Sequence, residues 1–307
     1  MRARPRAPIP AKRSGVVSMR CYGRTSMQAV RGTRRPFVSF ALFAASAALA
    51  CCTICGCGKR PLEPRDPTPG VPYFRIATFN CDDKEESDPA TIEAVGETGA
   101  DVIALEEITP AWEANLRARY GKQYPYMAFR PNGAAGLAML SIYPISEPQL
   151  LPAPNGFHPA WYTSVKTPAG WLRVLTVHLH SPDVGGLSSV SALQSLPGQH
   201  VEEMQDFTAS AFDGGPTIVL GDFNEGPDGA AVSWLEDRGF DNALPLYHPG
   251  QFTWRHASVG NQFEQDLDHI LFNGWLEPLN AYVIEAGNSD HIPVVALFQA
   301  PQAWPSP

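Results

Sequence analysis

The sequence predicts a layered α/β domain, and two observations carry this prediction. Apolar runs of strand length recur from Tyr73 onward, and segments with helix-capping residues lie between them in both halves of the chain. No internal repeat is visible, and 307 residues leave room for one large domain or two small ones.

Strands and helices alternate in the first half. A strand is expected at 73–80, followed by a helix with Asp88 as its N-cap and Pro89 as its first residue. A second strand at 101–108 leads into a second helix at 110–120. This alternation favours mixed α/β packing over an all-β or all-α fold.

The rest of the chain continues with more strands and fewer helices. A Gly/Ser-rich loop is expected at 183–198, followed by helices at 200–212 and 229–237. The remaining strands are expected at 126–129, 134–142, 161–166, 171–179, 217–220, 266–272, 281–285 and 292–298.

The strand at 217–220 ends in a polar motif. Gly221 closes the apolar run, and Asp222 and Asn224 follow two residues apart, so their side chains point the same way. A carboxylate and a carboxamide held together can bind a water molecule and an anionic oxygen. For this motif alone, an Asx turn that caps the strand is the simpler interpretation.

Similar polar endings recur on other predicted strands, and this repetition favours a functional site. Strand ends are where a rigid sheet presents side chains to a common cleft. The residues concerned are Asn80, Glu107, His178, Asp222, Asn224, Asp268, Asp290 and His291.

Charge is divided unevenly along the chain. The first 60 residues carry 12 Lys and Arg and no acidic residue, so the remainder holds 11 basic and 31 acidic residues, a net charge of −20. Such an acidic domain lacks the positive surface expected of a protein that grips long nucleic acid. Bound metal ions would reverse this charge locally.

The first 57 residues are expected to be an export signal. Arg34 and Arg35 precede an apolar run at 40–50, which is too short to span a bilayer as a helix. The arginine pair resembles a twin-arginine signal, and a general secretory signal is the alternative. Met27 is an alternative start of translation.

Five of the six cysteines lie in this leader, so the region after it cannot form an internal disulfide. Leu49-Ala50-Cys51-Cys52 resembles a lipoprotein cleavage box, and acylation of Cys51 or Cys52 would anchor the domain to a membrane. The Pro-rich segment 58–72 would then be an extended linker. Lipid anchoring and simple secretion both stay open, and we expect a periplasmic, outer-membrane-anchored or extracellular protein.

Seven short motifs occur in order between residues 73 and 299. They are Ala77–Asn80, Leu105–Ile108, Gly136–Ser141, Val177–Leu179, Gly221–Asn224, Leu267–Leu271 and Ser289–Val294. Together they resemble the endonuclease/exonuclease/phosphatase superfamily, which includes deoxyribonuclease-like enzymes and bacterial sphingomyelinases. The resemblance implies a four-layered α/β/β/α sandwich of two packed mixed sheets flanked by helices, with the catalytic domain at 73–299 and a C-terminal tail at 300–307.

The resemblance also implies a set of site residues around a Mg²⁺ ion, for which Mn²⁺ is a substitute. The implied metal ligands are Glu107, Asn80 and Asp290. The implied substrate-binding residues are Asn80, Asn224 and His178. The implied catalytic residues are His178, Asp222, Asn224, Asp268 and His291.

The expected chemistry is attack of water on a phosphoester. Asp268 would orient His291 for proton transfer, and Asp222 would orient or deprotonate the water; which of Asp222 and His291 is the base stays open. Glu106 stands where the family usually has Gln and alternates away from Glu107, so we expect it to face solvent or to pair with a cation.

A few further residues have an open interpretation. Asp82 is either a metal ligand or an exposed loop carboxylate, and Asp266 stands where the family often has Arg. Phe157 and Trp161 are most simply core or rim aromatics, with a place in the cleft as the alternative.

The leading hypothesis is a secreted or membrane-anchored, Mg²⁺-dependent phosphoesterase that acts on a phosphodiester or phosphomonoester. The acidic charge favours a small or lipid head-group substrate, and an extracellular nuclease acting on DNA or RNA is the alternative. A catalytically silent binding module of the same fold is the alternative of another class. A serine hydrolase is disfavoured because no Gly-x-Ser-x-Gly motif is present. No protein partner is evident.

Overall fold

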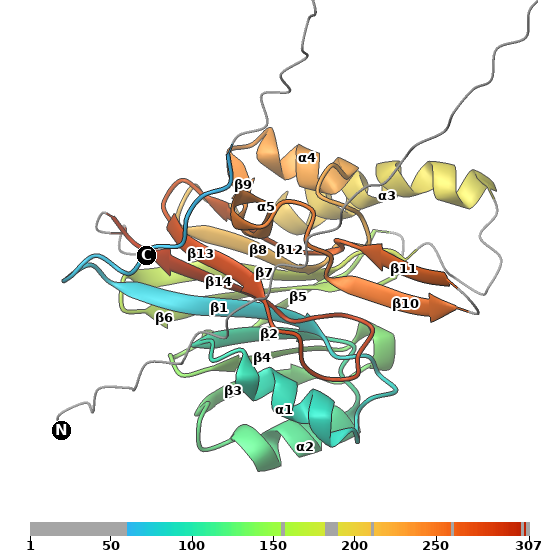
Figure 1. Cartoon of the computed structure of the whole chain (residues 1–307), viewed down its shortest axis with the longest axis horizontal. Helices are drawn as coiled ribbons and strands as arrows, with labels where there is room; N and C mark the ends of the chain where they lie inside the picture. Colours follow the sequence, from blue (N-terminus) through green and yellow to red (C-terminus); the bar gives the residue numbers. More distant parts are fainter. Residues whose placement is uncertain are drawn as a thin grey trace, which may run out of the picture. The chain divides into compact units, whose positions relative to one another are not determined.

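Two six-stranded sheets pack face to face in the computed structural model (Figure 1). The model describes residues 60–154, 157–181, 190–209, 212–258, 261–301 and 304. The predicted export signal at 1–57 and its cysteines lie outside the described residues. Among the described residues, no helix is both long and apolar enough to span a membrane.

The first sheet, sheet A, is mixed. The central pair β1 and β2 is parallel, and their neighbours run antiparallel to them. In spatial order its strands are β13 (Glu277–Val283), β14 (Val294–Gln299), β1 (Tyr73–Asn80), β2 (Val102–Glu106), β4 (Leu137–Ser141) and β3 (Tyr126–Arg130).

The second sheet, sheet B, is built in the same way around the parallel pair β7 and β8. In spatial order its strands are β5 (Gln149–Leu151), β6 (Ala160–Thr167), β7 (Gly170–His178), β8 (Thr217–Asp222), β12 (Asp268–Asn273) and β9 (Phe240–Asn242).

Helices cover the outer faces of both sheets (Figure 1). Helices α1 (Pro89–Glu97) and α2 (Pro110–Tyr120) pack on sheet A, and α3 (Val190–Ala209) and α4 (Ala230–Glu236) pack on sheet B. This arrangement confirms the predicted four-layered sandwich. The short helix α5 (Ala243–Tyr247) closes one edge of the core between the sheets.

Alternation along the strands divides the apolar residues between three cores. In β1, Phe74 and Ile76 enter the core between the sheets, whereas Ala77 and Phe79 pack under the helices. The central strands β1, β2 and β8 are almost fully buried because both of their faces are covered.

Several elements differ from the sequence predictions. Helix α3 begins at Val190 and contains Pro197, so the predicted loop at 183–198 is wrong from Val190 onward. Met204 and Phe207 anchor this helix on sheet B, and this packing outweighs the low helix propensity of its Gly/Ser-rich start. The ribbon of β10 (Trp254–Ser258) and β11 (Asn261–Gln265) was not predicted, because no apolar alternation marks it.

Residues 60–72 contain no helix or strand and bind along the domain. The backbone N–H groups of Leu62 and Arg65 donate to the carbonyl groups of Leu246 and Leu279, at 2.7 and 2.9 Å. Arg65 also pairs with Glu277 at 2.7 Å. This part of the predicted linker is therefore docked on the domain and is not a free spacer.

Candidate active site

Three polar side chains form a row across the centre of sheet B. His178 ends β7, Asp222 ends β8 and Asp268 begins β12, and the strand registers place both His178 and Asp268 directly opposite Asp222. All three side chains face sheet A, where they continue the inner rows of apolar residues. The site is therefore the polar end of the core between the sheets.

Sheet A contributes the opposite wall through Asn80, the last residue of β1. Its amide nitrogen donates to Glu107 Oε1 at 3.1 Å and to Asp222 Oδ2 at 3.2 Å. Asn80 is 1% exposed, so these are buried or half-buried bonds with little competition from water. One amide thus joins the two sheets at the site.

Asp222 lies between two imidazole rings. Its Oδ2 atom is 3.6 Å from His178 Nε2 and 3.5 Å from His291 Nε2. Burial opposes ionisation of this carboxyl, but the charges of His291 and His178 outweigh burial and hold its pKa below the usual value. The backbone N–H of Asn224 donates to Oδ1 at 2.8 Å and fixes the second oxygen.

His291 is oriented by Asp268, as the sequence resemblance implies. Its Nδ1–H donates to both carboxylate oxygens of Asp268, at 2.8 and 3.0 Å, which leaves Nε2 directed toward Asp222. Burial opposes the positive charge, but Asp268 and Asp222 outweigh it and raise the pKa of His291 to about 10. The imidazole therefore carries a proton on both nitrogens at neutral pH.

His178 has a fixed tautomer for a different reason. Its Nδ1 lies 3.0 Å from the carbonyl oxygen of Ala134, which can only accept a hydrogen bond, so this nitrogen carries a proton. Close packing supports the loop that carries Ala134, because a Cβ atom on Gly136 would lie 1.9 Å from the Ile108 carbonyl oxygen. The Nε2 atom of His178 is left for Asp222 or a substrate.

Three non-glycine residues of the described chain have positive φ angles, and all three flank this site. They are Asp82 at 57°, Glu107 at 60° and Asn224 at 51°, each after a strand that ends in the site. Such backbone costs roughly 1–3 kcal/mol per residue and persists at functional sites. Their coincidence here is an independent indication of function.

Asp82, Asp83 and Glu107 form a cluster of half-buried carboxylates. One oxygen of each lies within 4.8 Å of the others. The ammonium group of Lys84 is 3.7 Å from Asp82, but it is largely exposed and therefore contributes little. Three close carboxylates with one weak counter-charge suit a hard divalent cation, which prefers oxygen ligands.

The buried group of Asp222, Asp268 and His291 is also compact enough to hold an ion. Protonated His291 already lies against both carboxylates and offsets one of their two negative charges. The geometry therefore favours the half-buried carboxylate cluster as the metal site.

Gly221 allows β8 to approach β7 closely. Its φ is +137°, and a Cβ atom there would lie 1.8 Å from the Val177 carbonyl oxygen. No other residue fits without displacing the strand that carries Asp222. The close contact between β7 and β8 therefore explains why the motif has a glycine at position 221.

The turn after Asn224 is held by Glu225. Its carboxylate accepts from the N–H groups of Ala231 and Val232 at the start of α4, at 2.7 and 2.9 Å, and from His200 Nδ1 at 2.9 Å.

The Asn224 amide donates to the Leu179 carbonyl at 3.0 Å, which leaves its second N–H for another acceptor.

Asp290 lies beside the site but belongs to neither carboxylate cluster. Its Oδ2 accepts from the indole N–H of Trp254 at 2.9 Å, and its charge contributes to the raised pKa of His291. Its predicted role as a metal ligand, like the roles of the other site residues, stays a prediction.

The predicted solvent-facing position of Glu106 is wrong. Its side chain is fully buried and enters the core between the sheets, where Thr78 Oγ1 donates to Oε1 at 3.0 Å and Oε2 has no hydrogen-bond partner among the described residues. Burial, followed by the charge of Asp268, raises the pKa of Glu106 well above its usual value. No face of β2 meets solvent, so alternation along the strand could not place Glu106 outside the core.

Sequence reasoning also missed Asp83, although its position three residues after Asn80 in an acidic run was a usable signal. In the structure, its backbone N–H donates to Glu107 Oε2 at 3.2 Å.

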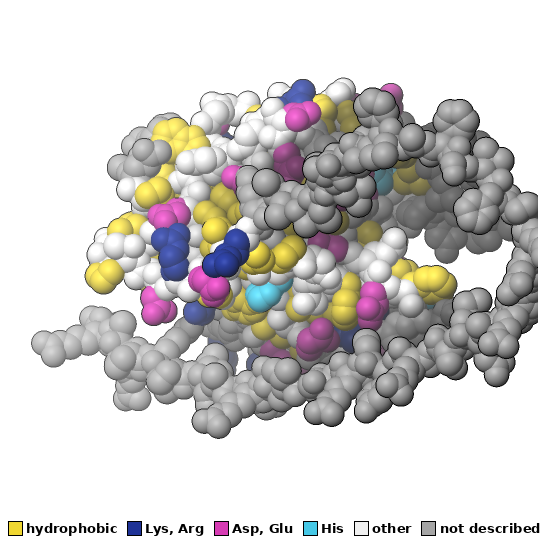
Figure 2. Space-filling model, turned by 45° about the horizontal axis from the view of Figure 1, so that its top comes forward, with side chains coloured by type: hydrophobic (Ala, Val, Ile, Leu, Met, Phe, Trp, Pro, Cys, Tyr) yellow, Lys and Arg dark blue, Asp and Glu magenta, His cyan; other side chains and the backbone are white. Residues whose placement is uncertain are grey.

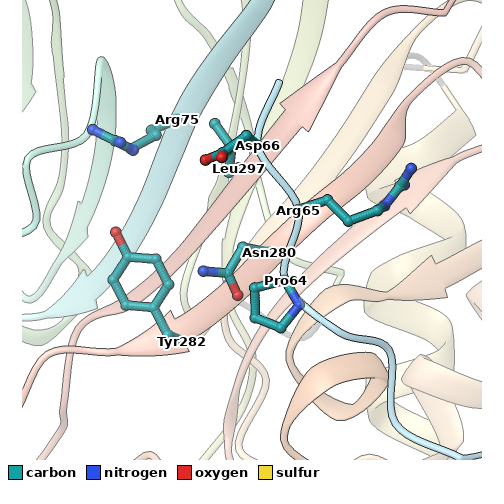
Figure 3. A pocket seen from close by; sticks show the side chains of 7 residues that line it. All are labelled: Pro64, Arg65, Asp66, Arg75, Asn280, Tyr282 and Leu297. Atoms are coloured by element: carbon teal, nitrogen blue, oxygen red, sulfur yellow. The ribbon is translucent and has the colours of Figure 1, made fainter. Parts of the chain in front are cut away.

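A cavity of about 420 Å³ lies away from these residues. It is formed where the docked segment at 64–66 crosses sheet A, with Asn280 and Tyr282 of β13 on the opposite wall (Figure 3). None of the predicted site residues lines it. The polar site between the sheets is therefore the better candidate for catalysis.

Comparison with solved structures shows the same fold. An endonuclease/exonuclease/phosphatase from Beutenbergia cavernae matches with a TM-score of 0.61 and 17% identity over 76% of this chain and 72% of that one. TDP2 from D. rerio, complexed with single strand DNA product, gives 0.56 and 17% over 74% and 98%. ANGEL2, a 2′,3′-cyclic phosphatase, gives 0.55 and 13% over 78% and 99%. No curated protein sequence matches the chain.

A family model identifies the chain directly. The model described as "Endonuclease/Exonuclease/phosphatase family" matches residues 77–291, which is most of the chain and includes every predicted site residue. The chain therefore belongs to the endonuclease/exonuclease/phosphatase family and is a metal-dependent phosphoester hydrolase.

Proposed function

We propose that this protein is an exported, Mg²⁺-dependent phosphoesterase that hydrolyses a phosphodiester or phosphomonoester by attack of water. One observation carries the proposal: Asp222 lies between the imidazoles of His178 and His291 and is joined through Asn80 to Glu107. A base, two cationic or polar donors and a carboxylate cluster for a metal thus meet at one place.

In this proposal Asp222 is the general base. Its lowered pKa keeps it ionised at neutral pH, so its oxygen can accept a proton from an attacking water. His291 stays protonated and donates through Nε2 to the phosphoryl oxygens. The proposal thus assigns the base to Asp222, a choice that the sequence left open.

His178 and Asn224 provide further hydrogen bonds to the phosphoryl group. The second amide N–H of Asn224 has no other acceptor among the described contacts. His178 would donate through Nε2 in its imidazolium form, because its Nδ1 proton is already given to the Ala134 carbonyl. Donors held at fixed positions stabilise the charge that builds up during attack.

Glu107, with Asp82 and Asp83, would hold the divalent cation, which would offset the negative charge of the phosphoryl and leaving oxygens. Oxygen ligands of this kind suit Mg²⁺, and Mn²⁺ would substitute for it. Asn80 would then orient Glu107, to which it donates at 3.1 Å, in addition to any direct contact with substrate or metal.

The substrate in this proposal is a small or lipid head-group phosphoester. The acidic charge after residue 60 disfavours a long polyanion. On the face shown in Figure 2, the described Lys and Arg side chains lie beside acidic ones and do not form an extended patch. A nuclease is the second candidate, because one similar structure holds a single strand DNA product.

The export part of the proposal depends on the N-terminal sequence alone. We expect the full chain to be processed and found in a membrane fraction. The double variant Cys51→Ser/Cys52→Ser should no longer be found in that fraction. Fractionation of a bacterial host with an antibody against the domain measures both. Full-length, unprocessed chain in the cytosol would contradict export.

Hydrolysis of bis-p-nitrophenyl phosphate tests the activity. We expect turnover with Mg²⁺ that stops on chelation and returns with added metal. Comparison of plasmid digestion with release of phospholipid head groups then separates the two substrate classes. Turnover that persists in chelator, or its absence with every substrate, would contradict the proposal.

A further inference from the structure

The segment just before β6 lies against the end of β7, beside the catalytic row. Antiparallel pairing of Trp161 with Thr176 brings the residues that precede β6 next to those that follow Thr176. As a result, two pairs of rings meet here. The centroids of His158 and His178 are 4.1 Å apart, and those of Phe157 and His180 are 3.6 Å apart, both edge to face.

We call Phe157, His158 and His180 the ring wall. Phe157 is 38% exposed, so part of its ring is open to a ligand. The Nδ1 atoms of His158 and His180 are buried and have no hydrogen-bond partner among the described residues. Buried polar atoms without partners are uncommon, and an ordered water, an ion or another bound group can satisfy them.

The ring wall is uncharged at neutral pH. Burial, followed by the charge of His178, lowers the pKa of His158 to about 3. Burial also lowers the pKa of His180. The wall therefore differs from the carboxylate cluster of Asp82, Asp83 and Glu107, which would repel an anionic substituent.

We propose that the ring wall binds a flat, uncharged ring of the phosphoester, such as an aryl or heterocyclic group, next to the phosphoryl site. The inference rests on the proposed function, because His178 is the residue that joins the ring wall to the phosphoryl site. Edge-to-face contacts with Phe157 and His158 favour a ring over an alkyl group, and the unpartnered Nδ1 atoms offer hydrogen bonds to a heteroatom. The ring wall is thus a determinant of substrate choice.

Binding of two phosphonates tests the ring wall without turnover. Phenylphosphonate and methylphosphonate share the charged group and differ only in the ring, and neither is hydrolysed. We expect calorimetry in the presence of Mg²⁺ to show about 10-fold tighter binding of phenylphosphonate, which corresponds to aromatic contacts of about 1.4 kcal/mol.

The variants Phe157→Ala and His158→Ala should each reduce this ratio to about 2 or less, and His158→Phe should retain it because the ring remains. Phe263→Ala is the matched control, because Phe263 is also an exposed phenylalanine and lies on the separate ribbon of β10 and β11. Thermal melting confirms that each variant folds.

The outcomes separate this inference from the proposed function. Equal binding of both phosphonates, or an unchanged ratio in Phe157→Ala and His158→Ala, overturns the ring wall even if bis-p-nitrophenyl phosphate is hydrolysed. A ring preference that the two variants remove supports the ring wall even if that substrate is not turned over, in which case only the proposed function fails. Absence of phosphonate binding together with absence of turnover overturns both.

Discussion

The two sheets contribute unlike halves to one site. Sheet B and the segment after β13 supply His178, Asp222, Asp268 and His291, all at most 7% exposed and paired with one another. The turns after β1 and β2 of sheet A supply half-buried carboxylates clustered around Glu107. Among the described residues, the cation paired with this cluster is Lys84, which is largely exposed.

This difference indicates what each half lacks. In the buried half, protonated His291 offsets part of the charge of Asp222 and Asp268, so this half can be stable before any ligand binds. The half-buried carboxylates repel one another and gain most from a divalent cation. The buried half is therefore suited to proton transfer and phosphoryl contact, and the carboxylate half to metal binding.

Removal of a group from the buried half should have the largest effect. Asp222→Asn and His291→Ala should each lower kcat by about 10³-fold, because general-base catalysis or a donor to the phosphoryl group is lost. Steady-state hydrolysis of bis-p-nitrophenyl phosphate measures this, with exposed His248→Ala as the unchanged control. Losses below about 10-fold in folded variants would contradict the assigned roles.

Removal of a charge from the carboxylate half should weaken metal binding instead. Glu107→Gln should raise the Mg²⁺ concentration for half-maximal activity about 10- to 100-fold and should approach wild-type kcat at high Mg²⁺. Glu97→Gln, at an exposed position at the end of α1, is the control. An unchanged Mg²⁺ dependence would remove Glu107 from the metal site.

Asp266 is a further buried carboxyl beside the buried half, and no positive charge among the described residues lowers its pKa. Burial and the nearby Asp268 raise the pKa of Asp266 from 3.8 to about 7. The folded state then keeps a proton that the unfolded chain loses, so stability falls as pH rises from about 4 to about 7. Asp266→Asn removes this fall, and its stability relative to wild type should rise by about 2 kcal/mol between pH 5 and pH 8.

Denaturant unfolding at both pH values measures this difference. Single changes of exposed carboxylates, such as Asp237→Asn, should not show it. A relative stability that does not change with pH would show that Asp266 ionises normally in the folded protein.

The smallest effect is expected at Glu106, which lies between the two halves. Burial and the charge of Asp268 raise its pKa well above the usual value, so we expect Glu106→Gln to replace one neutral acceptor of the Thr78 hydrogen bond with another. We expect the free energy of unfolding to change by less than about 1 kcal/mol and kcat by less than about 3-fold. A loss of about 3 kcal/mol or more would instead indicate a buried, ionised Glu106.

Strand ends, caps and the order of motifs were sufficient to predict the layers and most strands of the sandwich. They failed where tertiary packing decides the structure, as in the early start of α3 at Val190 and in the ribbon of β10 and β11. They also misplaced Glu106, because a strand pattern gives alternation but not whether the second face is covered by another sheet.

The members of the site could be predicted because polar residues after apolar runs are visible in the sequence. Their distances could not, since the register of His178 and Asp268 against Asp222 depends on pairing between segments about 45 residues apart. His158 was missed for a related reason. Only the pairing of β6 with β7 brings it against His178, and no local motif marks it.

Binding of Mn²⁺, measured by electron paramagnetic resonance, tests most directly whether the two halves divide metal binding and proton transfer between them. We expect wild type and the inactive Asp222→Asn variant to bind Mn²⁺ with similar affinity, and Glu107→Gln to bind it about 10- to 100-fold more weakly. Loss of Mn²⁺ from Asp222→Asn with full binding by Glu107→Gln would place the metal in the buried half and contradict this account.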